Sequence, residues 1–192
     1  EKESGENIVS LEIGGQEIKK SYKKLVIATG YNPPDQFKKN LENMELYKTY
    51  VAVSQKLEEK TYEDLLVWEV KDAYTYFKKT FDGRLMIGGF DEKSDMIKDK
   101  DVGKRDKDLI KGANSMLVDK YDLDVEYSYT ALFGISKDNL PYMGVDPENE
   151  DIFVICGVGG NGTVYSKIGT SMVAKWIKGE SLEEYETYKL GR

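Results

Sequence analysis

The glycine-rich stretch CGVGGNGTVYSKIG, residues 156–169, most constrains what this chain can form. It has five glycines in fourteen positions and follows the apolar run DIFVIC. A strand, a glycine loop and a helix in this order direct the free N–H groups of a helix N-terminus at whatever occupies the loop. Glycine lets a ligand touch the main chain and permits positive φ angles. The stretch predicts a ligand-binding loop or a glycine-rich turn without a ligand, because such strings also arise by chance.

A helix is predicted from Gly162 to Lys178, with Gly179 as its stop. Its apolar side carries Tyr165, Ile168, Gly169, Met172, Val173 and Trp176. The preceding loop does not match an opening dinucleotide fingerprint, since no βαβ unit or ribose-binding acid follows it.

Three strands are predicted near the start of the chain, at 8–13, 16–20 and 25–28, with a two-residue turn at Gly14-Gly15 between the first two. The third is an apolar run without alternation, which predicts burial on both faces. Prolines place 31–36 in a loop. The polar segment 35–45 that follows is compatible with a helix.

The middle of the chain predicts an antiparallel meander with strands at 49–57, 65–70, 73–79 and 84–90. Two-residue turns are expected at Lys71-Asp72 and Asp82-Gly83. The meander is rich in aromatic side chains, which can form core or line a pocket, and core is favoured for most of them. They are Trp68, Tyr74, Tyr76 and Phe77.

An amphipathic helix is predicted at about 104–120. A strand is expected within 124–137, then a loop at 138–144 closed by Pro141, then the apolar strand 151–156. The fold class is therefore α+β, with antiparallel and mixed sheets and flanking helices.

Composition excludes several classes of function. A net charge of −7 argues against nucleic acid and anionic lipid as partners. No apolar run approaches the roughly 20 residues of a membrane span, and the first residues do not resemble a signal peptide, so a cytoplasmic protein is expected.

The single cysteine, Cys156, is expected to be a small buried residue rather than a reactive thiol. The absence of histidine removes histidine-based catalysis and histidine-ligated metal sites, and no metal site is predicted.

Four segments resemble the C-terminal half of the FAD-dependent amino acid and amine oxidoreductases. They are KKLVIATGY (23–31), FDGRLMIGGF (81–90), ALFGISKDNLPYMG (131–144) and IFVICGVGGNGTVYSKIGTSMVAKWIKG (152–179). The resemblance implies that residues 1–48 end a Rossmann-like FAD-binding domain and that 49–140 form the substrate-binding domain. Residues 141–192 would return to the FAD-binding domain.

The resemblance also implies FAD as cofactor and a small amine or amino acid as substrate. Hydride would pass from the carbon next to the substrate nitrogen to the flavin. No catalytic residue is assigned. Asp138 is expected to have a structural role, and Arg84 is expected to be a turn-flanking surface residue. The implied cofactor-binding residues are Ala28, Thr29, Gly30, Gly157, Val158, Gly159, Gly160, Asn161, Gly162 and Thr163. Phe133 would contact the substrate, since it stands where some members carry an arginine for the substrate carboxylate.

In that family a GxGxxG phosphate loop lies some two hundred residues before the segment that matches 25–30, so the chain is expected to be a fragment. By itself it would be inactive and would not retain FAD. Homo-oligomers through the apolar strands 25–28 and 152–156 are expected. Two alternatives stay open. One is other flavin chemistry on the same fold, hydroxylation or 2-hydroxyacid oxidation, and the other is a non-catalytic binding module.

Overall fold

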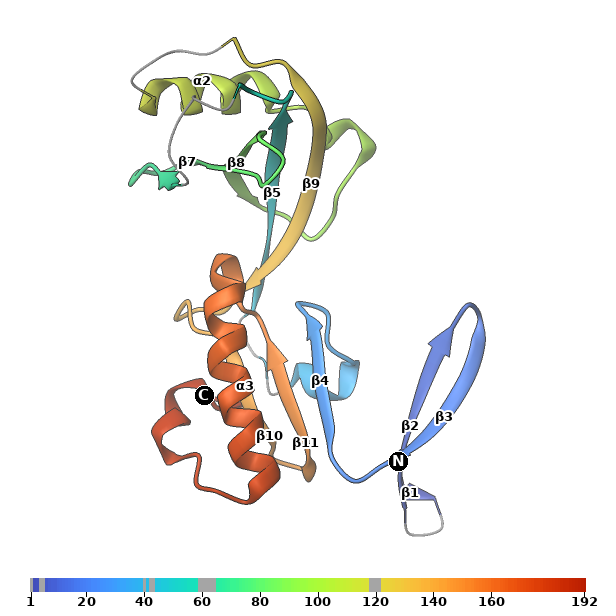
Figure 1. Cartoon of the computed structure of the whole chain (residues 1–192). Coiled ribbons are helices and arrows are strands. Elements are labelled where there is room, and N and C mark those ends of the chain that lie inside the picture. The colour runs from blue at the N-terminus through green and yellow to red at the C-terminus, as the bar shows by residue number, and fades with distance from the viewer. Residues whose placement is uncertain (1, 4–5, 40, 42–43, 59–64, 118–121) are drawn as a thin grey trace. The chain divides into compact units, whose positions relative to one another are not determined.

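A computed structural model describes the chain except for residues 1, 4–5, 40, 42–43, 59–64 and 118–121. The chain divides into two compact units (Figure 1). Unit 1 comprises residues 1–44 and 134–192, and unit 2 comprises residues 45–133. The predicted α+β class is confirmed, since antiparallel and mixed sheets occur with few helices.

Unit 1 begins with a three-stranded antiparallel sheet of β1 (Lys2–Glu3), β2 (Glu6–Ile13) and β3 (Gln16–Tyr22). The predicted two-residue turn is confirmed. Gly14 and Gly15 have φ angles of 58° and 77° between the paired Ile13 and Gln16. Positive φ at both central positions is the geometry that suits the twist of a tight hairpin.

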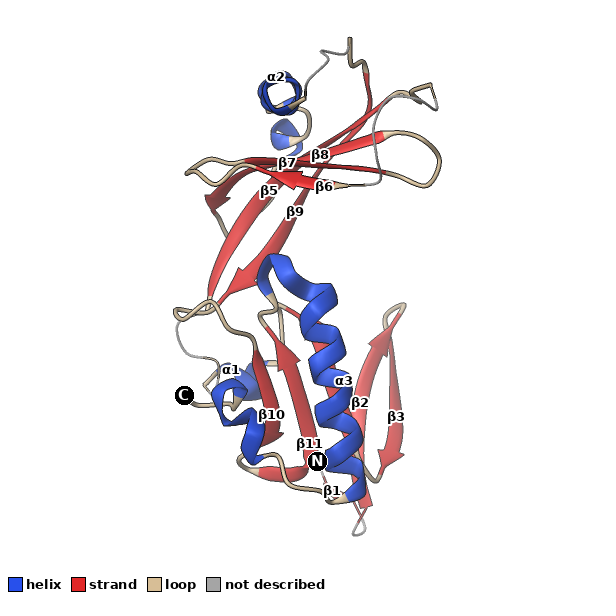
Figure 2. Ribbon diagram, turned by 60° about the vertical axis from the view of Figure 1, so that its left-hand side comes forward, coloured by secondary structure: helices blue, strands red, loops and turns tan. Residues whose placement is uncertain are grey.

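The second sheet of unit 1 is mixed, in the order β10 (Tyr142–Asp146), β11 (Asn149–Cys156) and β4 (Leu25–Gly30). β11 is antiparallel to β10 and parallel to β4. The helix α3 (Gly162–Lys178) packs on one face of this sheet, as Figure 2 shows. Its core cluster is Met143, Phe153, Met172 and Trp176.

The other face of the mixed sheet packs against α1 (Asp35–Lys38) and the end of the chain. This second cluster consists of Phe37, Leu41, Tyr142, Ile152, Val154, Cys156 and Leu190. The short helix η3 (Glu183–Tyr188) leads back to Leu190. α3 begins and ends at the predicted residues, with Gly179 in the left-handed conformation at its C-terminus.

Two predictions for unit 1 are wrong. Leu25 and Ile27 are half-buried, but Val26 is 39% exposed. β4 is therefore covered on one face only, because it is the edge strand and the α3 cluster contains no β4 residue among those described. Residues 142–144 belong to β10 rather than to a loop. Pro141 precedes the first residue of that strand, where proline removes no ladder hydrogen bond.

Unit 2 is built on a five-stranded sheet in the order β6-β7-β8-β5-β9. Its strands are β5 (Glu45–Ser54), β6 (Leu66–Trp68), β7 (Thr75–Lys79), β8 (Leu85–Lys93) and β9 (Val125–Ile135). β6, β7 and β8 form an antiparallel meander, as predicted. β5 pairs with β8, so the first strand of the predicted meander lies on the far side of β8 rather than next to β6.

The two predicted turns of the meander are longer than two residues. Residues 69–74 connect β6 to β7, with Ala73 at a φ of 53°. Residues 80–84 connect β7 to β8, where Gly83 has a φ of 84° and donates its N–H to the Thr80 carbonyl. The predicted Asp82-Gly83 signal therefore marks the turn, but three residues, 81–83, lie between the paired Thr80 and Arg84, with Gly83 in the αL position.

One face of the unit 2 sheet is covered by α2 (Asp106–Met116), with the short helix η1 (Asp99–Asp101) preceding it (Figure 2). The core between them consists of Tyr50, Ala52, Phe77, Leu85, Ile87, Leu109, Ala113 and Leu123. The predicted helix 104–120 is therefore shorter than expected. It ends at Met116, because Leu117 is extended, and residues 118–120 lie outside the described residues.

The contact between α2 and β7 generates a stability prediction. A Cβ on Gly112 would stand 2.4 Å from Oγ1 and 2.9 Å from Cβ of the buried Thr75. Glycine to alanine in a helix normally stabilises by about 1 kcal/mol. Gly112→Ala should instead lower the free energy of unfolding by about 1–3 kcal/mol, because Thr75 is branched and cannot move away. Urea unfolding measures this, with the exposed Lys111→Ala as control. A stabilised Gly112→Ala variant would contradict the packing described.

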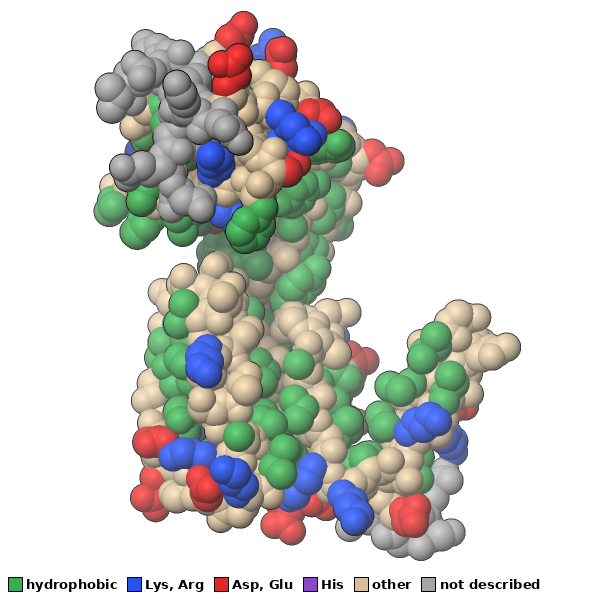
Figure 3. All heavy atoms as spheres, viewed as in Figure 1, with side chains coloured by type: hydrophobic (Ala, Val, Ile, Leu, Met, Phe, Trp, Pro, Cys, Tyr) green, Lys and Arg blue, Asp and Glu red, His purple; other side chains and the backbone are tan. Residues whose placement is uncertain are grey.

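The edge strand β4 generates a second prediction. Of the two strands expected to mediate association, β11 is paired on both sides, whereas the outer edge of β4 has no partner among the described strands. Figure 3 shows hydrophobic side chains at the surface beside α3, and Val26 is among the exposed apolar residues. Such an edge pairs readily with a second copy. Light scattering should show association that rises with concentration and weakens in Val26→Lys. Val164→Lys, which also replaces an exposed valine, should not weaken it. A monomer at all concentrations would refute this.

Candidate functional site

The glycine loop begins where β11 ends and turns the chain into α3. Gly157 and Gly159 have φ angles of 66° and 56°, which side-chain-bearing residues rarely adopt. The one-turn helix η2 (Gly159–Asn161) fills the interval before α3. The loop is therefore short, and its backbone conformation requires glycine at two positions.

The end of β4 lies directly beside this loop. Cys156 is in register with Gly30, and the Gly157 N–H donates to the Gly30 carbonyl at 3.2 Å. Because β4 and β11 are parallel, their carboxyl ends meet at one edge of the sheet. Open sheets with parallel strands place ligands at this edge. The structure thus brings together the two predicted cofactor-binding segments, 28–30 and 157–163, which are far apart in the sequence.

The space in front of these segments fits a ligand that approaches the main chain. No protein atom among those described lies within 4 Å of the position that a Cβ would take at Gly30 or Gly160. No side chain caps the N-terminus of α3, whose N-cap residue is Asn161. Amide groups of a helix start, next to two glycines with open space, suit the polar edge of a flavin or another anionic group. The residues present therefore fit FAD.

The predicted cofactor-binding residues divide into two groups. Ala28, Thr29, Gly30, Gly160, Asn161 and Thr163 are exposed, while Gly157 is buried and Val158, Gly159 and Gly162 are half-buried. A Cβ on Gly157 would stand 3.1 Å from Met44 Sδ, and one on Gly162 would stand 3.4 Å from Val158 Cγ2. Gly157 is therefore tightly packed within unit 1, whereas a side chain at Gly162 would make an ordinary van der Waals contact. Only part of the set faces open space.

The predicted substrate-contacting residue, Phe133, belongs to unit 2. It is half-buried, and its ring centroid lies 6.0 Å from that of Tyr47. It belongs to none of the three core clusters that the described residues form.

Of the meander aromatics, Phe77 is core, whereas Tyr74 and Tyr76 are half-buried and Trp68 is 61% exposed. The interpretation of most of them as core is therefore wrong, because only Phe77 faces α2.

Asp138 organises the turn between β9 and β10. Its Oδ1 accepts from the Ser136 hydroxyl at 2.7 Å and from the Leu140 N–H at 3.1 Å. The Arg192 guanidinium donates to both carboxylate oxygens, at 2.9 Å and 3.1 Å. Arg192, helped by Ser136 and Leu140, holds the pKa of Asp138 well below its usual range. Sequence reasoning did not identify Arg192, because nothing in the local pattern connects residues 54 positions apart.

Arg84 flanks the β7–β8 turn as expected, but it is not a surface residue, since its side chain is only 13% exposed. Its guanidinium donates to the Ser54 carbonyl at 3.1 Å, to Asp82 at 2.8 Å and to Glu126. These contacts connect the β7–β8 turn to β5 and β9 within unit 2. The Arg84 side chain therefore serves to join strands of the unit 2 sheet.

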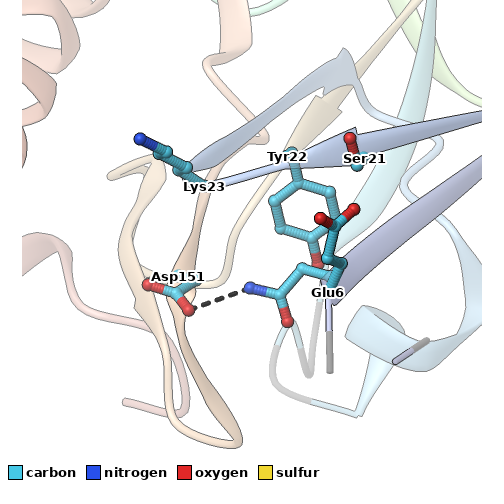
Figure 4. Close-up of a pocket in the computed structure, with 6 residues that line it drawn as sticks. Glu6, Ser21, Tyr22, Lys23 and Asp151 are labelled. Carbon is cyan, nitrogen blue, oxygen red and sulfur yellow. Dashed lines mark hydrogen bonds between the residues drawn. The ribbon is translucent and has the colours of Figure 1, made fainter. Parts of the chain in front are cut away.

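A pocket at the other end of β11 lies outside the predicted site (Figure 4). Its lining residues are Glu6, Asn7, Ser21, Tyr22, Lys23 and Asp151. Asn7 donates to Asp151 at 3.0 Å across it. Asp151 lies near the start of β11, whereas the glycine loop follows its end. Over the described part of the chain, no cluster of side chains is arranged to hold a metal ion, and no helix is long and apolar enough to cross a membrane.

Comparison with known proteins gives one family. The model of a family described as FAD dependent oxidoreductase matches residues 2–176. No curated protein matches the chain.

Solved structures share the fold. Glycine oxidase from Geobacillus kaustophilus superposes with a TM-score of 0.76 and 19% identity, over 95% of this chain and 48% of that one. Iminodiacetate oxidase from Chelativorans sp. BNC1 superposes with a TM-score of 0.72 and 12% identity, over 96% of this chain and 52% of that one. L-proline dehydrogenase from P. horikoshii superposes with a TM-score of 0.68 and 18% identity, over 96% of this chain and 53% of that one. The chain thus spans about half the length of these structures.

Cys156, beside the loop, provides a prediction. Burial raises the pKa of its thiol to about 11, and its Sγ lies 3.8 Å from Met44 Sδ. The thiolate is the reactive form and is present only above the pKa, so the native chain near neutral pH should react with a disulfide reagent at least about a hundredfold more slowly than a free thiol. The urea-unfolded chain is the control and should react at the ordinary rate. Rapid labelling of the native chain would refute the inert role predicted for this cysteine.

Proposed function

The chain belongs to the FAD dependent oxidoreductase family, and from this premise we propose that the complete protein oxidises an amine or an amino acid. Hydride would move from the carbon next to the substrate nitrogen to FAD. The observation that carries the proposal is the junction of the two glycine segments at the paired ends of β4 and β11. The three solved structures named above are oxidases or dehydrogenases of amino or imino acids by their names, which supports a C–N substrate.

Each part of the junction has a role in this proposal. When bound, FAD supplies the hydride acceptor. The open backbone at Gly30 and Gly160 lets the cofactor lie against the main chain. The N-terminus of α3 contributes a positive partial charge that stabilises negative charge on the polar edge of the ring. Ala28 and Thr29 would border the cofactor from β4.

We further assign unit 1 to the FAD-binding domain and unit 2 to the substrate-binding domain. The unit boundaries, 44/45 and 133/134, fall a few residues before those expected from the sequence. The sheet of unit 2 supports this assignment, because one of its faces lies outside the α2 core and presents exposed aromatic side chains such as Trp68.

Gly160 provides the direct test of the cofactor site. Gly160→Val should weaken FAD binding to the complete protein by at least about tenfold, which corresponds to about 1.4 kcal/mol. The reason is that the new side chain enters space that no described protein atom occupies, so it obstructs the cofactor and not the fold. Calorimetric titration of the apoprotein with FAD measures the affinity, and thermal unfolding reports on the fold.

Ala174→Val is the matched control, since it adds similar volume at an exposed position of α3. It should change neither quantity. If Gly160→Val binds FAD as tightly as the wild type, the cofactor does not lie at this loop. That the 192-residue chain does not retain FAD by itself stays a prediction. The same titration, carried out on this chain alone, tests it.

Phe133 generates a prediction on substrate preference. A phenyl ring cannot pair with a carboxylate, and burying that charge unpaired costs several kcal/mol. Phe133 and its neighbour Tyr47 instead offer aromatic surface to a protonated or alkylated amine. The complete protein should therefore prefer an amine over the corresponding amino acid, which carries an additional carboxylate. Phe133→Arg should raise kcat/KM for the amino acid, because arginine binds a carboxylate through two hydrogen bonds.

The measurement is kcat/KM on matched pairs of amino acid and amine, for wild type and variant. Phe133→Leu, which removes the ring without adding charge, is the control. A wild type that favours the amino acid by about a hundredfold or more, about 2.7 kcal/mol, with no gain in the arginine variant, would show that position 133 does not set the preference.

A further inference from the structure

A β-bulge in β8 turns Asp91 away from the α2 core. Gly89 pairs with Tyr50 and Glu92 pairs with Lys48, so residues 90–91 oppose a single residue of β5. Phe90 has a φ of 54° and packs against the α2 core. Strand alternation would place Asp91 on the α2 side, and the extra residue reverses this. A bulky residue in the left-handed region is strained, and such strain is concentrated at functional sites.

Asp91 consequently lies among tyrosines on the face of the sheet opposite α2. The Tyr74 hydroxyl donates to Asp91 Oδ2 at 2.6 Å, and the rings of Tyr74 and Tyr76 lie 6.2 Å apart. Burial, with Asp91 as the next cause, raises the pKa of both tyrosines, so they stay protonated. Trp68 is the cross-strand partner of Tyr76 and is exposed. The carboxylate of Asp91 thus lies beside two tyrosines.

The second oxygen of this carboxylate has no hydrogen-bond partner among the described residues. Asp91 Oδ1 is buried and accepts no hydrogen bond from any described residue, and no ion pair to Asp91 forms among them. Lys78 shares the face, but it is opposite Met86, five residues from Asp91 along β8. That separation is about 17 Å, too far for an ion pair. A buried carboxylate oxygen without a donor is costly unless a ligand supplies one.

We propose that Asp91, Tyr74 and Tyr76 form a binding site for the ammonium group of an amine substrate. An ammonium group supplies the N–H donor that Oδ1 lacks and the positive charge that the carboxylate pairs with. Aromatic faces attract the same cation, so the rings of Tyr74 and Tyr76 add to the attraction of the carboxylate. The inference rests on the proposed function for its substrate, and it names the class as amines that carry a protonated nitrogen.

The test is direct binding to the 192-residue chain, without flavin. Butylammonium is the probe, and butanol and butyrate are its uncharged and anionic counterparts of similar size. In an NMR titration, butylammonium should shift amide signals of β7 and β8 and bind at least about fivefold more tightly than either counterpart. Equal binding of butanol, or shifts confined to other elements, would overturn the proposal.

Three variants resolve the site. Asp91→Asn keeps the shape and removes the charge, and should weaken butylammonium binding by about fivefold or more. Asp95→Asn removes an exposed charge nearby and should leave it unchanged. Tyr76→Leu should weaken it by about threefold through loss of the ring, which decides the matter if Asp91→Asn does not fold. If Asp91→Asn folds and binds butylammonium as the wild type does, the proposal is overturned. If Asp91→Asn does not fold, unchanged binding by Tyr76→Leu overturns it. These binding measurements contain no flavin. A failure of the ammonium site can therefore be distinguished from a failure of the proposed function, in which the complete protein would not oxidise amines.

Discussion

The parallel pairing of β4 with β11 is the interaction on which the candidate site depends. It joins residues more than a hundred positions apart and ends in the hydrogen bond from the Gly157 N–H to the Gly30 carbonyl. Without it, the segment 28–30 and the glycine loop would have no common edge. The pairing is stabilised from both sides of the sheet. Ile152 and Val154 are buried toward α1, and Phe153 is buried toward α3.

The glycines of unit 1 serve two different purposes. A Cβ on Gly157 would crowd Met44 at 3.1 Å, and one on Gly162 would be in ordinary contact with Val158 at 3.4 Å. Gly30 and Gly160 have none, so their missing side chains leave space outside the fold. A count of glycines cannot separate these roles, since both follow from the same residue type. Gly30 has a φ of 75°, which by itself favours glycine, whereas Gly160 has open space without a positive φ.

Unit 2 shows how one strained residue can decide which chemistry a sheet face presents. The bulge at Phe90 directs Glu92 to the α2 side, where it accepts from Tyr50 at 2.6 Å and pairs with Lys48 at 3.0 Å. Lys48 also pairs with the buried Asp101 at 2.9 Å, which fastens η1 to the sheet. Asp91 is left on the opposite face. Adjacent carboxylates of one strand therefore have different roles, one in a structural network and one beside the tyrosines.

The sequence alone determined the elements whose causes are local. The Gly14-Gly15 hairpin, the bounds of α3 and its stop at Gly179 follow from turn chemistry and periodicity over a few residues. The motifs in their order also indicated the family that the comparisons support. Tertiary structure decided the rest, because it depends on contacts between distant residues. It made β4 a half-exposed edge, placed β5 beyond β8, joined Arg192 to Asp138 and turned Asp91 toward the tyrosines. No pattern over a short window contains the partner strand that fixes register, and register decides which face each side chain occupies.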